Sequence, residues 1–105
     1  MTALRTPSRT TLRKYGLTED EWASIADAQG RVCFVCGKVP NSGILHIDHE
    51  HARGWKKMEP EDRKRYVRGL LCWFCNSVMV RKGATPEKLR RAAEYLEKYF
   101  SRPQD

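Results

Sequence analysis

The chain has 105 residues, 40% hydrophobic and 31% charged, a composition typical of one globular domain. Twenty Lys and Arg against 13 Asp and Glu give a formal net charge of +7, which favours polyanionic partners such as nucleic acids, although ordinary solubility charge is the competing explanation. No apolar run approaches the roughly 20 residues that cross a bilayer, and the N-terminus lacks the apolar block of a secretory signal. We therefore do not expect a membrane as a partner, and we expect the protein to act in a reducing, intracellular compartment.

The first residues mix Arg, Thr and Ser with little apolar periodicity. We expect residues 1–14 to form a flexible basic arm. One folded domain is expected at residues 15–101, followed by a short tail at residues 102–105.

A helix is predicted at about residues 19–29. Thr18 and Glu21 have the spacing of a capping box, in which the threonine hydroxyl caps the helix and the glutamate bonds back to the cap backbone. Trp22 begins an apolar series at helical spacing, and Gly30 supplies a stop.

Two strands are predicted farther along the chain. Residues 44–49 alternate between apolar and polar side chains, as in a half-buried strand, and a second strand is expected at residues 66–71. Strand alternation places Asp48 and His49 on opposite faces, unless the chain bends at the strand end. Residues 52–65 are polar and are expected to form a loop, with a helical turn at residues 59–62.

The last predicted element is a helix that opens at Thr85, with Pro86 in its first turn. It carries one apolar stripe, formed by Leu89, Ala92, Ala93, Leu96 and Phe100. This stripe and that of the Trp22 helix could cover the core of the monomer or form the interface of a homodimer.

The four cysteines fall in two Cys-x-x-Cys pairs, Cys33/Cys36 and Cys72/Cys75. Two tight turns that each present a pair of thiolates suit tetrahedral zinc. A reducing compartment disfavours the alternative of two disulfides, and a redox dithiol would need a thioredoxin-like βαβ setting that the sequence lacks. One structural zinc ion is therefore predicted, and four thiolates leave it no open position for catalysis.

All three histidines lie in the segment His46-Ile47-Asp48-His49-Glu50-His51. A polar strand end is the structural explanation, but histidines interleaved with acids also form metal and catalytic sites. Asp48 offers an oxygen ligand that suits Mg²⁺. The imidazole of His49 can act as a general base near neutral pH.

The motifs, taken in order, resemble those of the recombination endonuclease VII family of phages, which are HNH-like nucleases. The resemblance runs from about residue 15 to residue 97. It rests on Tyr15-Gly16-Leu17-Thr18, Gln29-Gly30, Cys33-x-x-Cys36-Gly37, the segment from His46 to His51, and Val67-Arg68-Gly69-Leu70-Leu71-Cys72-x-x-Cys75-Asn76. It implies an α+β fold, a small zinc-bound domain whose ββα-metal (His-Me finger) core is flanked by helices.

The resemblance also implies a metal-dependent DNA endonuclease that hydrolyses phosphodiester bonds, either in branched or junction DNA or by nicking duplex DNA. Asp48 and Asn76 would hold one catalytic Mg²⁺ or Mn²⁺ ion, and His49 would activate water. His51 would lie near the scissile phosphate, while Glu50 and His46 would be supporting residues. The zinc ligands would be Cys33, Cys36, Cys72 and Cys75.

Paired cuts in a DNA junction need two active sites, which favours a homodimer. A phage origin implies that the protein acts in the cytoplasm of a bacterial host.

Met79 stands one turn after Asn76, where an acidic residue could have added a metal ligand. This difference weakens the case for strict junction specificity. Seven basic residues could bind the DNA backbone: Arg53, Lys56, Lys57, Arg63, Lys64, Arg65 and Arg68.

Two other functions stay open from the sequence alone. A zinc-ribbon module that binds nucleic acid without cutting it would need only the cysteine pairs and a basic face. A zinc-scaffolded adaptor would use its final helix to bind another protein. Neither explains why Asp48, His49 and Asn76 accompany the cysteines.

Overall fold

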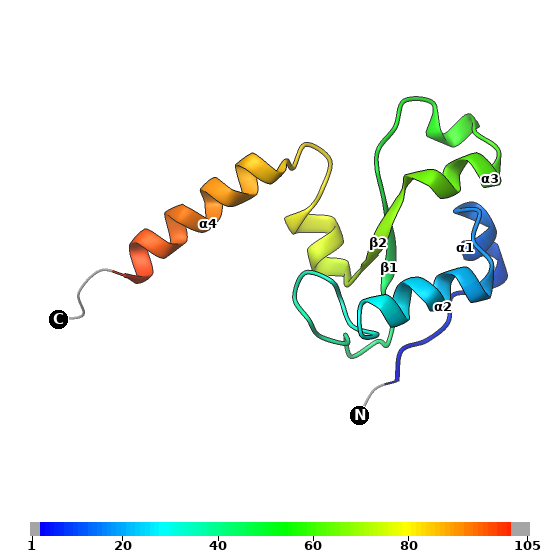
Figure 1. Cartoon of the computed structure of the whole chain (residues 1–105), viewed down its shortest axis with the longest axis horizontal. Coiled ribbons are helices and arrows are strands. Elements are labelled where there is room, and N and C mark those ends of the chain that lie inside the picture. The colour runs from blue at the N-terminus through cyan, green and yellow to red at the C-terminus, as the bar shows by residue number, and fades with distance from the viewer. Residues whose placement is uncertain (1–2, 102–105) are drawn as a thin grey trace.

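The computed structural model describes residues 3–101 as a small α+β fold, in which short helices lie beside one antiparallel two-stranded sheet and the last helix extends away from it (Figure 1). Its elements are α1 (Arg9–Lys14), α2 (Glu19–Ala28), β1 (His46–His49), η1 (Trp55–Lys57), α3 (Pro60–Arg63), η2 (Lys64–Tyr66), β2 (Val67–Leu71), η3 (Cys75–Met79) and α4 (Pro86–Phe100). The predicted α+β class is confirmed at this level. Within the described residues no helix is long and apolar enough to cross a membrane.

The hairpin of β1 and β2 is irregular at the point where the histidine segment begins to leave the sheet. Asp48 is paired with Gly69, but His49 is paired with Val67, so Arg68 is an extra residue in β2. Such a bulge kinks the strand and re-aims side chains. Burial in β1 does not alternate: the adjacent Ile47 and Asp48 are both buried, whereas His46 is exposed.

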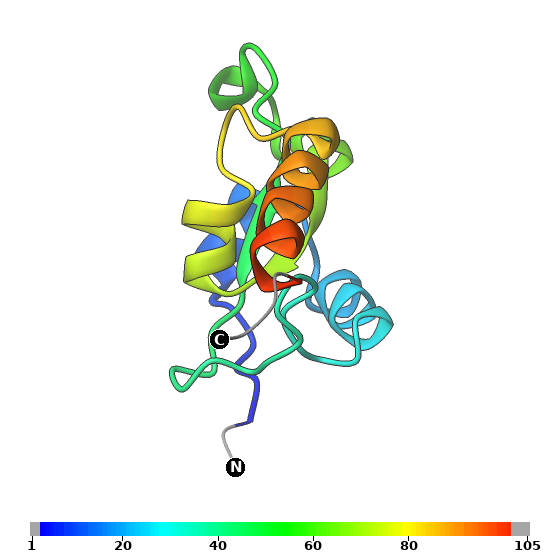
Figure 2. The ribbon, with the colours of Figure 1, turned by 90° about the vertical axis from the view of Figure 1, so that its left-hand side faces the viewer.

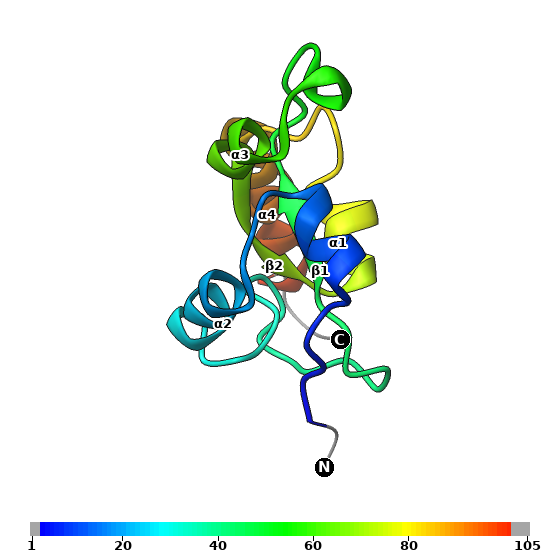
Figure 3. The ribbon, with the colours of Figure 1, turned by 90° about the vertical axis from the view of Figure 1, so that its right-hand side faces the viewer.

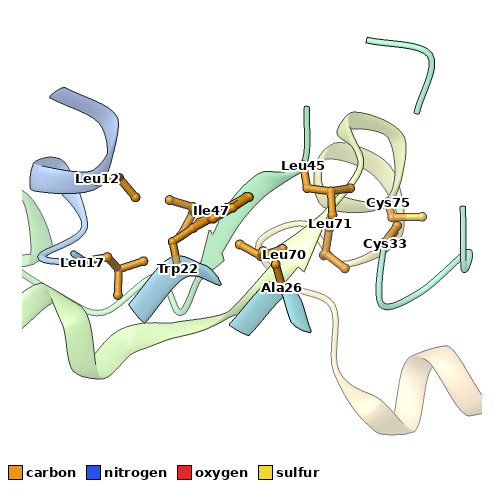
Figure 4. Close-up of a cluster of buried hydrophobic side chains, with 10 residues drawn as sticks. All are labelled: Leu12, Leu17, Trp22, Ala26, Cys33, Leu45, Ile47, Leu70, Leu71 and Cys75. Atoms are coloured by element: carbon orange, nitrogen blue, oxygen red, sulfur yellow. The ribbon is translucent and has the colours of Figure 1, made fainter. Parts of the chain in front are cut away.

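Helix α2 covers the hairpin because its apolar side faces β2. The predicted capping box is present: Thr18 Oγ1 accepts from the Glu21 amide at 3.1 Å, and the Thr18 amide donates to Glu21 Oε1 at 3.0 Å. Trp22 and Ala26 are almost fully buried. Figure 4 shows the core as a strip of side chains with Leu12 and Leu17 at one end and the cysteines at the other.

The end of α2 is tied to the hairpin by one side chain. Gln29 Nε2 donates to the carbonyl oxygens of Val32 and Leu70, each at 2.9 Å, and Gln29 Oε1 accepts from the Leu70 amide at 2.8 Å. The side-chain amide of Gln29 thus makes the hydrogen bonds to the backbone of β2 that a third strand would otherwise make. A Cβ atom at Gly69 would lie 2.9 Å from Gln29 Oε1, so a side chain at position 69 would disturb this contact.

Part of the expected N-terminal arm is a helix. α1 starts after Ser8, whose Oγ accepts from the Thr11 amide at 3.2 Å, and it buries Leu12 in the core. The prediction of a flexible arm was therefore wrong for residues 9–14. A helix of this length has little stability of its own, so the burial of Leu12 holds it in place. Residues 1–2 of the arm and the tail at 102–105 lie outside the described residues.

The segment between the strands contains the predicted helical turn as α3, together with the short turns η1 and η2. Arg63 holds this segment against α1, beside which α3 lies (Figure 3). Its guanidinium donates to the carbonyl oxygens of Lys14 at 3.0 Å, Lys56 at 2.8 Å and Trp55 at 3.2 Å. Arg63 is therefore a structural residue of this segment, and its charge is directed toward the protein backbone.

Helix α4 begins as predicted, with Thr85 Oγ1 accepting from the Lys88 amide at 3.1 Å. It projects away from the hairpin in Figure 1 and therefore lies in front of it in Figure 2, and not one of its residues is buried. The radius of gyration is consequently 16.2 Å, against about 13 Å for a compact chain of this length. Of the two apolar stripes, that of α2 covers the core, and that of α4 does not.

Replacing Gln29 with Ala should lower the free energy of unfolding by about 1–3 kcal/mol. Leu70 is fully buried, its amide would lose the Gln29 acceptor, and its carbonyl would keep only the longer bond of 3.3 Å from the Phe34 amide. Chemical denaturation monitored by Trp fluorescence measures the change. Asp27→Ala is the matched control on the same helix, since it removes only an exposed ion pair with Arg31. Equal losses in the two variants would show that Gln29 does not tie α2 to β2.

Candidate functional site

Four cysteine sulfurs from two distant parts of the chain converge beside the hairpin. The Sγ atoms of Cys33, Cys36, Cys72 and Cys75 all lie within 4.8 Å of one another, and Cys36 Sγ is 3.9 Å from Cys72 Sγ. A tetrahedron with zinc–sulfur bonds of 2.3 Å has edges of about 3.8 Å. All four are free thiols, not disulfides. The cluster could therefore hold a zinc ion, as the sequence predicts.

Local backbone bonds shape the two cysteine turns. In the first turn the Cys33 amide donates to Lys38 O and the Gly37 amide donates to Cys33 O, each at 2.9 Å, and Gly37 has a φ of 72° that favours glycine. In the second, the Asn76 amide donates to Cys72 O at 3.0 Å. The Phe34 amide donates to Leu70 O at 3.3 Å, which holds the first turn against β2.

Electrostatics within the cluster favour a thiolate. Burial raises the pKa of Cys33, but hydrogen bonds from backbone amides, above all that of Cys36, outweigh it and lower the pKa to about 6. Thiolates are the form in which cysteine binds metal ions. Burial, together with the neighbouring thiols, raises the pKa of Cys75, so without a metal the cluster favours a thiolate at Cys33 and a thiol at Cys75. The donor set thus matches zinc in number and spacing.

The histidine segment and the second cysteine turn border one hollow, of about 430 Å³, which we call the His49 hollow. The lining includes all four residues for which the resemblance implies catalytic roles, Asp48, His49, His51 and Asn76, together with Tyr15, Ile47, Ser77, Arg81 and Lys82. Ile47, Asp48 and His49 line it in a row at the end of β1, opposite the bulge in β2. Asn76 reaches it because Cys75 fixes the start of η3.

The two residues expected to have supporting roles do not line this hollow. His46 is exposed and lines an adjoining hollow, which shares Tyr15, Ile47 and Asn76 with the His49 hollow. Glu50 is exposed, and its backbone amide donates to Tyr66 O at 2.8 Å. The segment therefore separates into residues that line the His49 hollow and residues that do not.

Asp48 is the one buried charged side chain among the described residues, with 6% of its surface exposed, and Arg68 neutralises it. Arg68 Nε donates to Asp48 Oδ2 at 2.7 Å and Arg68 Nη2 donates to Asp48 Oδ1 at 3.1 Å. This pairing raises the pKa of Arg68 above its ordinary value. Both carboxylate oxygens of the expected metal ligand are thus in contact with a guanidinium.

The His49 imidazole lies among three other rings. It stacks on Trp55 with ring centroids 4.2 Å apart and planes at 23°, and its centroid is 5.5 Å from that of Tyr15 and 5.0 Å from that of His51. Burial lowers the pKa of His49, and the neighbouring His51 lowers it further. His49 is consequently neutral at neutral pH, the state in which an imidazole can accept a proton.

Several residues around this site carry weak signals in the sequence. Trp55 is 8% exposed, and its Nε1 has no hydrogen-bond partner among the described residues. A tryptophan in an otherwise polar loop is the one local sign in the sequence that this loop packs against other parts of the protein, here the rings of Tyr15 and His49. Arg81 and Lys82 are ordinary basic residues in the sequence, and only the turn of η3 brings them to the hollow.

Comparisons with known proteins relate most of the chain to one endonuclease family and to two phage proteins. A family model described as recombination endonuclease VII matches residues 8–98, from α1 into α4. The Gene 59 protein of Mycobacterium phage D29 is 34% identical over 89 residues, which cover 83% of this chain and 47% of that protein. The Gene 59 protein of Mycobacterium phage L5 is 34% identical over 87 residues, covering 81% and 46%. The chain spans about half the length of these curated relatives, and no solved structure matches it.

Replacing Cys72 with Ser should unfold the domain or strongly destabilise it, because a structural zinc ion contributes its binding free energy directly to folding. Elemental analysis of the purified wild-type protein should give about one zinc per chain, as expected of one tetrahedral site. Lys38→Ala is the control, since it changes an exposed side chain in the first cysteine turn and keeps the backbone carbonyl that Cys33 uses. A zinc-free wild-type protein with an undiminished melting temperature would contradict the assignment.

The ring of His49 should titrate below its ordinary pKa of 6.5, because burial disfavours the imidazolium. NMR titration of the ring protons measures this, and Trp55→Leu should move the pKa back toward 6.5 by exposing the ring. The unfolded chain takes up this proton first as pH falls, so the associated stability is lost below pH 6.5 toward the folded pKa. A His49 pKa above 6.5 would show that the nearby Asp48 carboxylate outweighs burial.

Proposed function

Because this chain belongs to the recombination endonuclease VII family, we propose that it is an endonuclease that hydrolyses phosphodiester bonds of DNA with a bound divalent cation. One observation carries the proposal: Asp48, His49, His51 and Asn76 border the same hollow. An oxygen ligand, a neutral imidazole and further polar groups around one space are the parts that metal-assisted hydrolysis requires.

We further propose that β1, β2 and η3 form the ββα-metal unit of a His-Me finger nuclease. Their order supports this, since the hairpin is followed directly by the helical turn that starts at Cys75. In η3 the Val80 amide donates to Cys75 O at 2.9 Å, the spacing of a π-helix. Single π turns occur frequently at functional sites. A zinc ion on the cysteine cluster would hold this turn against the hairpin.

Asp48 and Asn76 would hold the catalytic cation, Mg²⁺ or Mn²⁺. Their fit rests on chemistry: a carboxylate and a side-chain amide oxygen are hard donors, and the two border one hollow with space for water and phosphate beside them. The ion would supply a Lewis acid that neutralises charge on the phosphate. Neighbouring side chains of the protein would activate the water and bind the phosphate.

His49 would accept a proton from the attacking water. Its lowered pKa keeps it neutral, and the stack on Trp55 fixes the plane of the ring. His51, Arg81 and Lys82 line the same hollow and would bind the non-bridging oxygens of the scissile phosphate. Charge that develops in the transition state would thus meet donors that are already in position.

The DNA on either side of the cut would lie along the exposed basic residues between the strands. Of the seven basic residues identified in the sequence, Arg63 binds backbone carbonyls, Lys64 pairs with Glu21 and Arg68 pairs with Asp48. The other four are exposed: Arg53, Lys56, Lys57 and Arg65. Phosphate contacts of this kind position DNA without reading its sequence.

Branched DNA is the substrate class that we propose, cut by a homodimer that supplies two active sites. The apolar stripe of α4 supports this, since Leu96 and Phe100 are 52% and 72% exposed. Light scattering should give twice the chain mass for the wild type and the chain mass for Leu96→Glu. The phage relatives support the cytoplasm of an infected bacterium as the place of action.

Replacing His49 with Ala should reduce DNA cleavage at least about a hundredfold, the scale of general-base catalysis, while folding and DNA affinity stay close to wild type. Asn76→Ala should raise the Mg²⁺ concentration needed for half-maximal rate as well as lowering the rate. Single-turnover cleavage of a labelled branched duplex measures both. His46→Ala is the matched control, because this histidine is on the same strand but does not line the His49 hollow. Equal cleavage by His49→Ala and wild type would remove His49 as the base.

Substituting Arg53, Lys56, Lys57 and Arg65 together with Ser should weaken DNA binding and flatten its dependence on salt. Each lost phosphate contact lowers the log–log slope by about 0.9, so the full set lowers it by up to about 3.6. Fluorescence anisotropy at several salt concentrations gives the slope. The control changes four basic residues of α4 to Ser: Lys88, Arg90, Arg91 and Lys98. If the control flattens the slope and the loop variant does not, DNA lies along α4.

A further inference from the structure

The contact between Arg68 and Asp48 conflicts with the role proposed for Asp48. The guanidinium contacts both carboxylate oxygens, at 2.7 and 3.1 Å. A divalent cation on the same carboxylate would lie next to this fixed positive charge. Like charges so close repel strongly where water is largely excluded, and Asp48 is 6% exposed.

The two partners reach Asp48 from different sides. Asp48 borders the His49 hollow with Asn76, and it also borders a second hollow of about 400 Å³ that Arg68 lines with Val80 and Leu89. Arg68 does not line the His49 hollow. The carboxylate thus separates a side open to a cation from a side occupied by a guanidinium.

Resting on the nuclease function proposed above, we propose that Arg68 is a switch between the cation and the DNA. Without DNA, Arg68 neutralises Asp48 and opposes cation binding. When DNA binds, a backbone phosphate draws Arg68 away, and the carboxylate becomes available to Mg²⁺ or Mn²⁺. DNA and the cation therefore bind cooperatively, and the site assembles fully only on its substrate.

Arg68 is free enough to make this exchange. It is the unpaired residue of the bulge, and 44% of its side chain is exposed. Among the described residues, its guanidinium makes one other hydrogen bond, to Val80 O, which is long at 3.5 Å. Guanidinium groups bind phosphate and carboxylate in the same two-pronged way. The exchange also keeps every charge paired. The partner of Asp48 changes from the guanidinium to the metal cation, and the partner of Arg68 changes from the carboxylate to a phosphate.

The reciprocal coupling can be measured without any cleavage. Isothermal titration of His49→Ala protein with Mn²⁺, alone and with saturating branched duplex, should show at least about tenfold tighter Mn²⁺ binding when DNA is present. A titration of the DNA alone with Mn²⁺ is subtracted. Arg68→Met in the same background should bind Mn²⁺ more tightly than its parent in the absence of DNA, and DNA should then add little.

Two results would overturn the switch. One is weaker or unchanged Mn²⁺ binding by Arg68→Met without DNA, which would make Arg68 a residue that orients Asp48 for the ion. The other is equal Mn²⁺ affinity of the parent protein with and without DNA, a measurement that holds even if Arg68→Met does not fold. Cleavage by the wild type is measured separately. If the protein cuts DNA but DNA and Mn²⁺ do not bind cooperatively, the proposed nuclease function stands and the Arg68 switch is wrong.

Discussion

The convergence of four cysteine sulfurs is the constraint on which the rest of the molecule depends. The core of the described chain is small, a strip of side chains between α2 and the hairpin (Figure 4), and a chain of this size commonly needs a metal, a disulfide or a partner to fold. The cluster joins the turn after α2 to the turn after β2. Because Asn76 follows Cys75 directly, the same junction determines where Asn76 lies relative to Asp48 and His49.

A second constraint acts inside the hairpin. A buried carboxylate needs a partner, and the bulge at Arg68 supplies one from the neighbouring strand. Three consecutive residues at the end of β1, Ile47, Asp48 and His49, border the His49 hollow opposite this bulge. The ion pair that neutralises Asp48 therefore lies directly beside the site.

Local signals in the sequence predicted much of this structure. The Thr18–Glu21 box, the two strands, the cysteine pairs and the cap at Thr85 each depend on residues within one short segment, and the structure contains all of them. Features set by contacts between distant segments could not be predicted. The helix α1 depends on the burial of Leu12, and the stack of Trp55 on His49 depends on how the loop folds back. The order of the motifs predicted that Asp48, His49 and Asn76 share one site. It did not predict the pairing of Arg68 with Asp48, because that contact depends on the register of the two strands.

The central claim is that this zinc-knuckle scaffold carries an active site and does more than bind DNA. Incubating the wild-type protein with a labelled branched duplex tests it directly, with Mg²⁺ or with EDTA in place of the metal. We expect cleaved strands with Mg²⁺ and intact strands with EDTA. A branched duplex that is bound and retarded on a gel but stays uncut with both Mg²⁺ and Mn²⁺ would contradict this claim and leave a binding module.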